Sequence, residues 1–118
     1  MKSIVLIVDD EFGLAEISAD LLAEDGFEVA IAINGKLALA ALAARPADLV
    51  ITDLMMPVMD GLELIRRIRA DPKLATIPIV LMTALPEALG DDAAHDALLV
   101  KPFSMKELLD VARRLTTR

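Results

Sequence analysis

Short aliphatic runs alternate along the chain with longer segments of helical periodicity, and this alternation limits the fold more than any other feature. The aliphatic runs predict strands at residues 4–8, 28–33, 48–52, 77–82 and 97–100. The first run is continuously apolar, which is typical of a parallel strand buried on both faces, whereas residues 28–33 indicate a more exposed strand. Strands that alternate with helices predict an α/β fold built on a parallel sheet.

The segments between these runs carry helix signals. Residues 11–24 have Leu14, Ile17, Leu21 and Leu22 at helical spacing, and Asp25-Gly26 supplies a stop. We also predict an Ala/Leu helix at 36–45 after an Asn34-Gly35 turn, a helix from the cap Asp60 to about residue 70, and a last helix capped by Ser104. The inward residues are expected to be Leu64, Ile65 and Ile68 in the third helix and Met105, Leu108, Leu109, Ala112 and Leu115 in the last.

One segment lacks clear helical periodicity. Residues 84–96 contain a glycine and few regularly spaced apolar residues. We therefore expect a shortened fourth helix between the fourth and fifth strands.

Composition limits the class of protein. A chain of 118 residues with 56% apolar content fits a single domain, residues 1–118. Its net charge of −7 disfavours direct contact with nucleic acid, because such contact requires a basic surface. The opening apolar run is too short for a signal peptide or a membrane span, so we expect a cytoplasmic protein without a membrane partner. There is no cysteine, and hence no disulfide or thiolate metal site.

Polar residues stand where four of the predicted strands end. They are Asp9, Asp10, Asp53, Thr83 and Lys101. In an open parallel sheet, ligands bind in the crevice outside the carboxyl ends of the strands, so these residues are expected to converge. Three carboxylates, a hydroxyl and an ammonium group predict a site for a hard cation and a phosphoryl group.

Four motifs at these strand ends identify a family. VDDE, TDLMMPVMDG, MTA and KPF occur in this order, and with them the chain from Ile4 to Arg114 resembles the receiver domain of two-component response regulators. The resemblance implies a flavodoxin-like, doubly wound sheet of five parallel strands in the order 2-1-3-4-5. The expected architecture is (βα)5 with a shortened fourth helix.

The resemblance also implies a Mg²⁺ site. In receivers of this pattern, Asp10 and Asp53 coordinate the metal directly, Asp9 holds it mainly through water, and the backbone carbonyl of Met55 adds a ligand. Mg²⁺ suits such a sparse set of oxygen ligands because it retains several waters and accepts phosphoryl oxygens.

By the same resemblance, Asp53 accepts a phosphoryl group from a histidine kinase or a histidine phosphotransfer protein. Thr83 and Lys101 are expected to stabilise the phosphoryl oxygens, and the Lys101–Pro102 bond is expected to be cis. The protein is then no turnover enzyme, since it only phosphorylates itself and slowly loses the group. Its kinase and downstream protein target are not specified, and it acts either as a stand-alone receiver or as part of a longer chain.

Two departures from the family pattern affect the output. Leu98 occupies the position three residues before the lysine, where receivers commonly have an aromatic switch residue. The stretch from Thr83 to Lys101 is also shorter than usual. We therefore expect phosphorylation to be reported by movement of Thr83 and of residues 84–96.

Several alternatives remain open for single residues. Asp9 and Asp10 could cap a helix, and Asp53 taken alone could also be a capping residue. Thr83 could bond to backbone, and Lys101 could be solvated. His95 matches no motif and is expected to be exposed. The methionines Met55, Met56 and Met59 are poor evidence for a soft-metal site without cysteine or a second histidine. A haloacid-dehalogenase-like phosphatase is disfavoured because its second aspartate should come two positions after the first, where this chain has Glu11.

Overall fold

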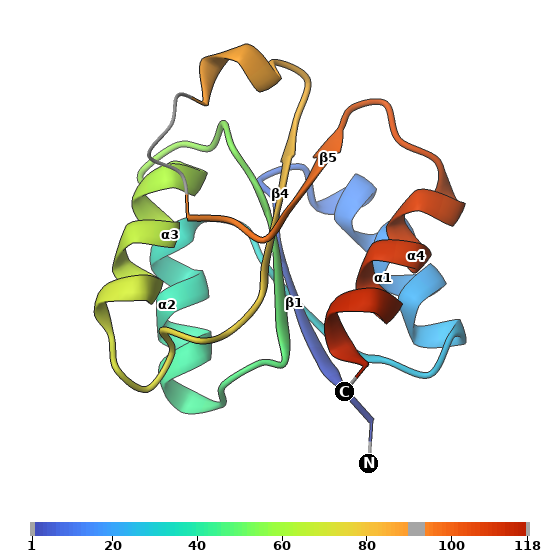
Figure 1. Cartoon of the computed structure of the whole chain (residues 1–118), viewed down its shortest axis with the longest axis horizontal. Helices are drawn as coiled ribbons and strands as arrows, with labels where there is room; N and C mark the ends of the chain where they lie inside the picture. The colour runs from blue at the N-terminus through green and yellow to red at the C-terminus, as the bar shows by residue number, and fades with distance from the viewer. Residues whose placement is uncertain (1, 90–93, 118) are drawn as a thin grey trace.

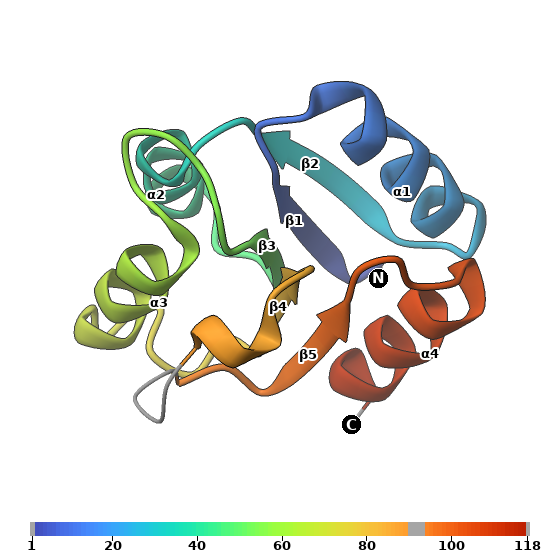
Figure 2. The same cartoon turned by 90° about the horizontal axis from the view of Figure 1, so that it is seen from above.

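The computed structural model describes residues 2–89 and 94–117 and shows a twisted parallel sheet with helices on both faces (Figures 1 and 2). The strand order is β2-β1-β3-β4-β5, which confirms the predicted flavodoxin-like topology. The strands are β1 (Ile4–Val8), β2 (Glu28–Ala32), β3 (Leu49–Asp53), β4 (Ile79–Thr83) and β5 (Ala97–Val100). All neighbouring pairs are parallel.

Two helices cover each face of the sheet. Helices α2 (Gly35–Ala44) and α3 (Gly61–Ala70) lie on one side, and α1 (Phe12–Glu24) and α4 (Met105–Thr116) lie on the other (Figure 2). The strands therefore contribute to two apolar cores. In β1, Leu6 packs towards α2 and α3 whereas Ile7 packs towards α1 and α4, which explains the unbroken apolar run. Among the described residues, no helix is both long and apolar enough to cross a membrane.

Helix starts follow side-chain chemistry that the sequence displays. Asp60 accepts a hydrogen bond from the backbone N–H of Glu63 at 2.9 Å, and Ser104 accepts one from Glu107 at 3.0 Å. Both predicted caps are confirmed. Asn34, predicted as part of a turn, instead caps α2. An amide oxygen at a helix start satisfies a backbone donor that has no partner within the helix, so a cap forms there instead of a free turn.

Some strand limits differ from the prediction by one or two residues. β2 ends at Ala32, β3 extends to Asp53, and β4 runs from Ile79 to Thr83. Asp53 and Thr83 are thus the last residues of their strands. Both residues lie within the sheet ladder, where Asp53 pairs with Met82 and Thr83 pairs with Val100.

The expected shortened helix after β4 is a single 3₁₀ turn, η1 (Pro86–Ala88), in the described part of the segment. Residues 90–93 lie outside the described residues. The chain re-enters the sheet at Asp96, whose backbone N–H donates to the carbonyl of Ile79 at 2.8 Å.

Helix α1 buries only part of the apolar set that its spacing predicts. Leu22 is buried, but Leu14 and Ile17 are 53% and 55% exposed. Ala15, a small residue, is buried in their place. Met105, the first residue of the predicted stripe of α4, is also exposed. Part of each helix's apolar surface is thus left out of the core.

Arg69, near the end of α3, ties together the segments that lead into β4 and β5. Its guanidinium donates hydrogen bonds to the carbonyl oxygens of Ala75 (2.9 Å), Ile77 (2.6 Å) and Ala94 (2.9 Å). It also forms an ion pair with Asp96 at 2.8 Å. Because several backbone acceptors depend on this one side chain, its removal leaves them without their donor at once.

We predict that Arg69→Ala lowers the free energy of unfolding by about 2–4 kcal/mol. The control Arg67→Ala breaks only an exposed ion pair with Glu63 and should cost less than about 1 kcal/mol. Urea unfolding followed by circular dichroism suits the test, because the chain contains no Trp or Tyr. Equal losses in the two variants would contradict a structural role for the Arg69 network.

Candidate functional site

The sheet register brings the predicted site residues to one edge. Thr52, which precedes Asp53 in β3, pairs with Val8 of β1, and Asp53 pairs with Met82 of β4. On the next strand, Thr83 pairs with Val100, the residue before Lys101. All five predicted residues therefore lie at the carboxyl ends of adjacent strands.

Three carboxylates cluster at this edge. Asp9, Asp10 and Asp53 each place one oxygen within 4.8 Å of the others, and in the described part of the chain this is the one such group of acidic or histidine side chains. Asp9 and Asp53 are buried, whereas Asp10 is exposed. Asp9 also accepts a hydrogen bond from the backbone N–H of Glu11 at 3.0 Å. Asp9 thus supports the start of α1 as well as contributing an oxygen to the cluster.

The environment of Asp9 disfavours its negative charge. Burial raises the pKa of its carboxyl group, and the nearby carboxylates of Asp53 and Asp10 raise it further. The backbone N–H of Glu11 and the ammonium group of Lys101 act in the opposite direction without cancelling the effect. A divalent cation would offset both the desolvation and the repulsion between carboxylates. The oxygen-only donor set fits Mg²⁺.

Lys101 contacts the carboxylate of Asp53. Its ammonium nitrogen lies 3.2 Å from Asp53 Oδ1, although Lys101 follows β5 and Asp53 ends β3. The backbone N–H of Lys101 donates to the carbonyl of Thr83 at 2.8 Å, which holds the residue beside β4. The peptide bond between Lys101 and Pro102 is cis, as predicted. The ammonium group of Lys101 points towards Asp53, and the side chain is half-buried.

The hydroxyl of Thr83 is buried and bonded to the following backbone. Its Oγ1 accepts a hydrogen bond from the N–H of Leu85 at 2.9 Å. The sequence left open that Thr83 bonds to the backbone, and this contact is of that kind. It uses only an acceptor lone pair of the hydroxyl, so the hydroxyl proton stays available to another acceptor.

The loop after β3 carries the methionines. The Met55 side chain is exposed, whereas Met56 and Met59 pack against the core beneath α2 and α3. The role of the Met55 carbonyl as a metal ligand stays a prediction. The packing of the other two shows a structural use for these methionines that needs no soft metal.

Gly61 is a site determinant whose structural role the sequence interpretation missed. A Cβ atom at Gly61 would lie 2.4 Å from the carbonyl oxygen of Asp53 and 3.0 Å from Cα of Leu54. The N–H of Gly61 also donates to the carbonyl of Leu54 at 2.8 Å. The start of α3 therefore packs directly against the backbone of Asp53. The only signal in the sequence is a glycine directly after the cap Asp60.

The burial of His95 differs from the prediction. It is half-buried instead of exposed, and its Nδ1 atom is buried. It precedes β5, at the opposite edge of the sheet from the carboxylate cluster. His95 therefore takes no part in this site.

Sequence relatives of the chain are response regulators. Residues 5–113 match the family model described as the response regulator receiver domain. The DNA-binding response regulator MtrA of Mycolicibacterium paratuberculosis is 38% identical over 113 residues, which cover 92% of this chain and 49% of that protein. The chain thus spans about half the length of the curated relatives it matches.

Solved receivers share the fold. The chemotaxis response regulator CheY4 of Vibrio cholerae superposes with a TM-score of 0.90 at 32% identity, covering 98% of this chain and 99% of that chain. The receiver domain of the sensor histidine kinase PA1611 from Pseudomonas aeruginosa, described with a magnesium ion coordinated in its active site cleft, has a TM-score of 0.87 at 27% identity. Each chain covers 98% of the other in that comparison.

Proposed function

Because the chain belongs to the response regulator receiver family, we propose that it accepts a phosphoryl group on Asp53 in a phosphorelay. The observation that carries the proposal is the arrangement around this one carboxylate. Asp53 is buried, Lys101 approaches it to 3.2 Å, and two further carboxylates share its edge of the sheet. Such a site combines a nucleophile with groups that stabilise phosphoryl oxygens.

The proposed metal ligands are Asp10 and Asp53 directly, Asp9 mainly through water, and the backbone carbonyl of Met55. A bound Mg²⁺ would screen the repulsion between the anionic nucleophile and the anionic phosphoryl group. The carboxylate cluster supports this assignment. The magnesium ion in the related PA1611 receiver domain supports it further.

The proposed reaction is a displacement at phosphorus. A carboxylate oxygen of Asp53 forms a bond to phosphorus while the bond to the donor breaks, and the leaving group keeps the electron pair. Lys101 places its charge on one phosphoryl oxygen, and Thr83 donates its hydroxyl proton to another. Positioning and charge stabilisation account for nearly all of the catalysis in such a transfer.

The proposed phosphoryl donor is a histidine kinase or a histidine phosphotransfer protein. The proposed location is the cytoplasm, as expected for a receiver domain. We further propose that the protein turns over no substrate beyond its own phosphorylation and slow dephosphorylation. The acidic charge argues against nucleic-acid contact by these 118 residues. It does not bear on nucleic-acid contact by other parts of a longer protein, such as the DNA-binding relatives.

Acetyl phosphate, a small phosphoryl donor, provides the direct test. In the presence of Mg²⁺, intact-mass spectrometry should show the gain of one phosphoryl group, and peptide mapping should place it on the segment that contains Asp53. Chelation of Mg²⁺ should prevent the gain. A protein that stays unmodified with Mg²⁺ and excess donor would refute the proposed function.

We propose that Thr83 reports phosphorylation to the segment that follows it. The bond from the Leu85 N–H to Thr83 Oγ1 links the site to η1. A Thr83 hydroxyl drawn towards the phosphoryl group would release the Leu85 amide and so bias this segment. Leu98 cannot serve as an aromatic switch, and this route needs none.

Hydrogen exchange measured by NMR tests this route. Beryllofluoride, a phosphoryl mimic, should speed exchange at the Leu85 amide and alter protection across residues 84–89. Thr83→Ala should remove the response, whereas Thr83→Ser keeps the hydroxyl and should retain it. Changes confined to α1 or α2 in the wild-type protein would place the output surface elsewhere.

A further inference from the structure

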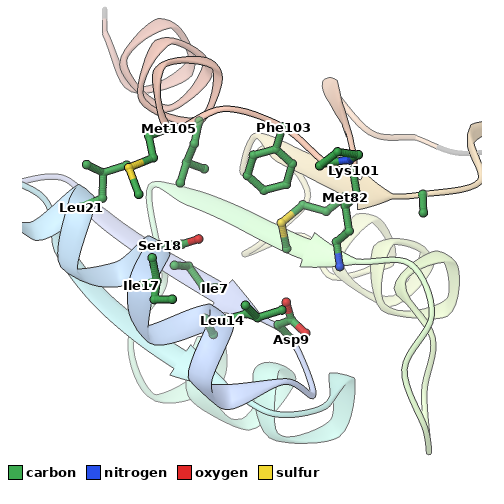
Figure 3. Close-up of a pocket in the computed structure, with 14 residues that line it drawn as sticks. Ile7, Asp9, Leu14, Ile17, Ser18, Leu21, Met82, Lys101, Phe103 and Met105 are labelled. Carbon is green, nitrogen blue, oxygen red and sulfur yellow. The ribbon is translucent and has the colours of Figure 1, made fainter.

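An open apolar groove of about 460 Å³ lies between α1 and the start of α4 (Figure 3). Core side chains form its floor, namely Ile7, Met82 and Leu108. The walls come from Leu14, Ile17 and Leu21 of α1 and from Phe103 and Met105 on the other side. The volume falls within the range of small-molecule sites in proteins.

The exposed walls of this groove are not required to pack the two helices. Leu14, Ile17 and Met105 are each more than half exposed, at 53%, 55% and 59%. Helix α1 is anchored instead by Ala15 and Leu22, which are buried. Exposed apolar side chains that surround a hollow can bind a ligand at little structural cost.

The groove is continuous with the phosphoryl site. Asp9 and Lys101 line one end of it, and Figure 3 shows Leu21 and Met105 at the other. Apart from Asp9, Lys101 and Ser18, the described lining is apolar. A matching occupant therefore has a phosphoryl group at one end and an apolar chain at the other.

We propose that the groove binds the chain of medium-length acyl phosphates and so makes them better phosphoryl donors than acetyl phosphate. This inference rests on the proposed function of Asp53. In the reaction, an Asp53 oxygen forms the new bond to phosphorus, the bond between phosphorus and the acyl oxygen breaks, and the acyl carboxylate leaves with the electron pair. Lys101 directs the phosphoryl end, while Leu14, Ile17 and Met105 contact the chain.

A second copy of this chain is a poor occupant of the groove. Each copy carries a net charge of −7, so association of two copies brings like charges together. Helix α1 itself has acidic but no basic residues, which places like charges beside the groove of both copies. A small amphipathic anion that contacts Lys101 covers a much smaller part of the surface than a second copy does, so it experiences less of this repulsion.

Burial of each methylene group in the groove can improve transfer by up to about fourfold. Hexanoyl phosphate should therefore phosphorylate the protein at least about tenfold faster than acetyl phosphate at equal, subsaturating concentration. The rates are measured with Mg²⁺ by intact-mass spectrometry. If acetyl phosphate reacts and hexanoyl phosphate is no faster, the inference fails while the proposed function stands. If neither donor reacts, the proposed function fails as well.

Variants of the groove locate the effect. Leu14→Ala with Ile17→Ala should reduce the ratio of hexanoyl to acetyl rates at least about threefold, because the α1 wall loses contact area at two side chains. Met105→Ala, on the opposite wall, tests the same groove independently. Leu37→Ala is the matched control, since Leu37 is similarly exposed on α2, across the sheet, and should leave the ratio unchanged. A ratio unchanged in both groove variants would overturn the inference.

Binding can also be detected without reaction. Hexylphosphonate carries the same kind of chain on a phosphorus group that cannot be transferred. Its addition should shift the methyl NMR signals of Ile17 and Met105 and leave those of Leu37 in place. Shifts at Leu37 alone, or no shift at the groove methyl groups, would contradict binding of the chain in the groove.

Discussion

Asp53→Asn is expected to abolish the Mg²⁺-dependent gain of a phosphoryl group while the protein stays folded. An amide oxygen is a far weaker nucleophile than a carboxylate, and the substitution also removes one of the three negative charges of the carboxylate cluster proposed to hold Mg²⁺. The fold should survive because the amide oxygen can still accept the hydrogen bond from the Leu54 N–H, which Asp53 Oδ1 accepts at 3.0 Å. Intact-mass spectrometry after incubation with acetyl phosphate measures the loss.

Asp60→Asn is the matched control for this prediction. It removes the same charge from the loop that follows β3, and asparagine caps helices as well as aspartate does. The control should therefore take up the phosphoryl group like the wild-type protein. A mass gain that persists in Asp53→Asn would move the phosphoacceptor to another residue.

Gly61→Ala should damage both the fold and the site. A Cβ atom here would meet the Asp53 carbonyl oxygen at 2.4 Å, and the backbone can relieve that contact only by moving the end of β3 or the start of α3. We expect the free energy of unfolding to fall by about 2–3 kcal/mol. Displacement of the Asp53 backbone by even a fraction of an ångström should slow phosphorylation, by up to about a hundredfold.

Gly13→Ala separates this effect from the general effect of replacing glycine. Nothing lies within 4 Å of a Cβ atom at Gly13, and the residue is on the exposed side of α1. The control should keep wild-type stability or gain up to about 1 kcal/mol. Calorimetric titration with Mg²⁺ then compares the sites, and wild-type affinity in Gly61→Ala would show that the close contact does not position Asp53.

Local chemistry in the sequence was enough to predict most of the architecture. Aliphatic runs located all five strands, and side-chain oxygens at Asp60 and Ser104 located two helix starts. Both signals act over a few neighbouring residues, so they can be recognised without knowledge of the rest of the chain. Convergence of the site residues followed from one topological rule, that the carboxyl ends of parallel strands share an edge.

Packing decided what the local pattern left open. Helix α1 has one apolar stripe that includes Leu14 and Ile17 and another that includes Ala15 and Leu22, and its spacing is compatible with either stripe facing the sheet. The small side chain of Ala15 is buried against the sheet, which leaves the larger pair at the groove. That choice depends on the positions of the sheet and α4, which local periodicity does not contain.

The sequence by itself therefore determined the order of the elements and the chemical identity of the site residues. Only the tertiary structure decided their distances, because these depend on contacts between segments far apart in the chain. The 3.2 Å approach of Lys101 to Asp53 requires the β4 strand between theirs to set the spacing. The contact of Gly61 with the Asp53 backbone likewise arises where α3 packs on the end of β3. Because of this packing, residue 61 has room for a hydrogen atom but not for a Cβ atom.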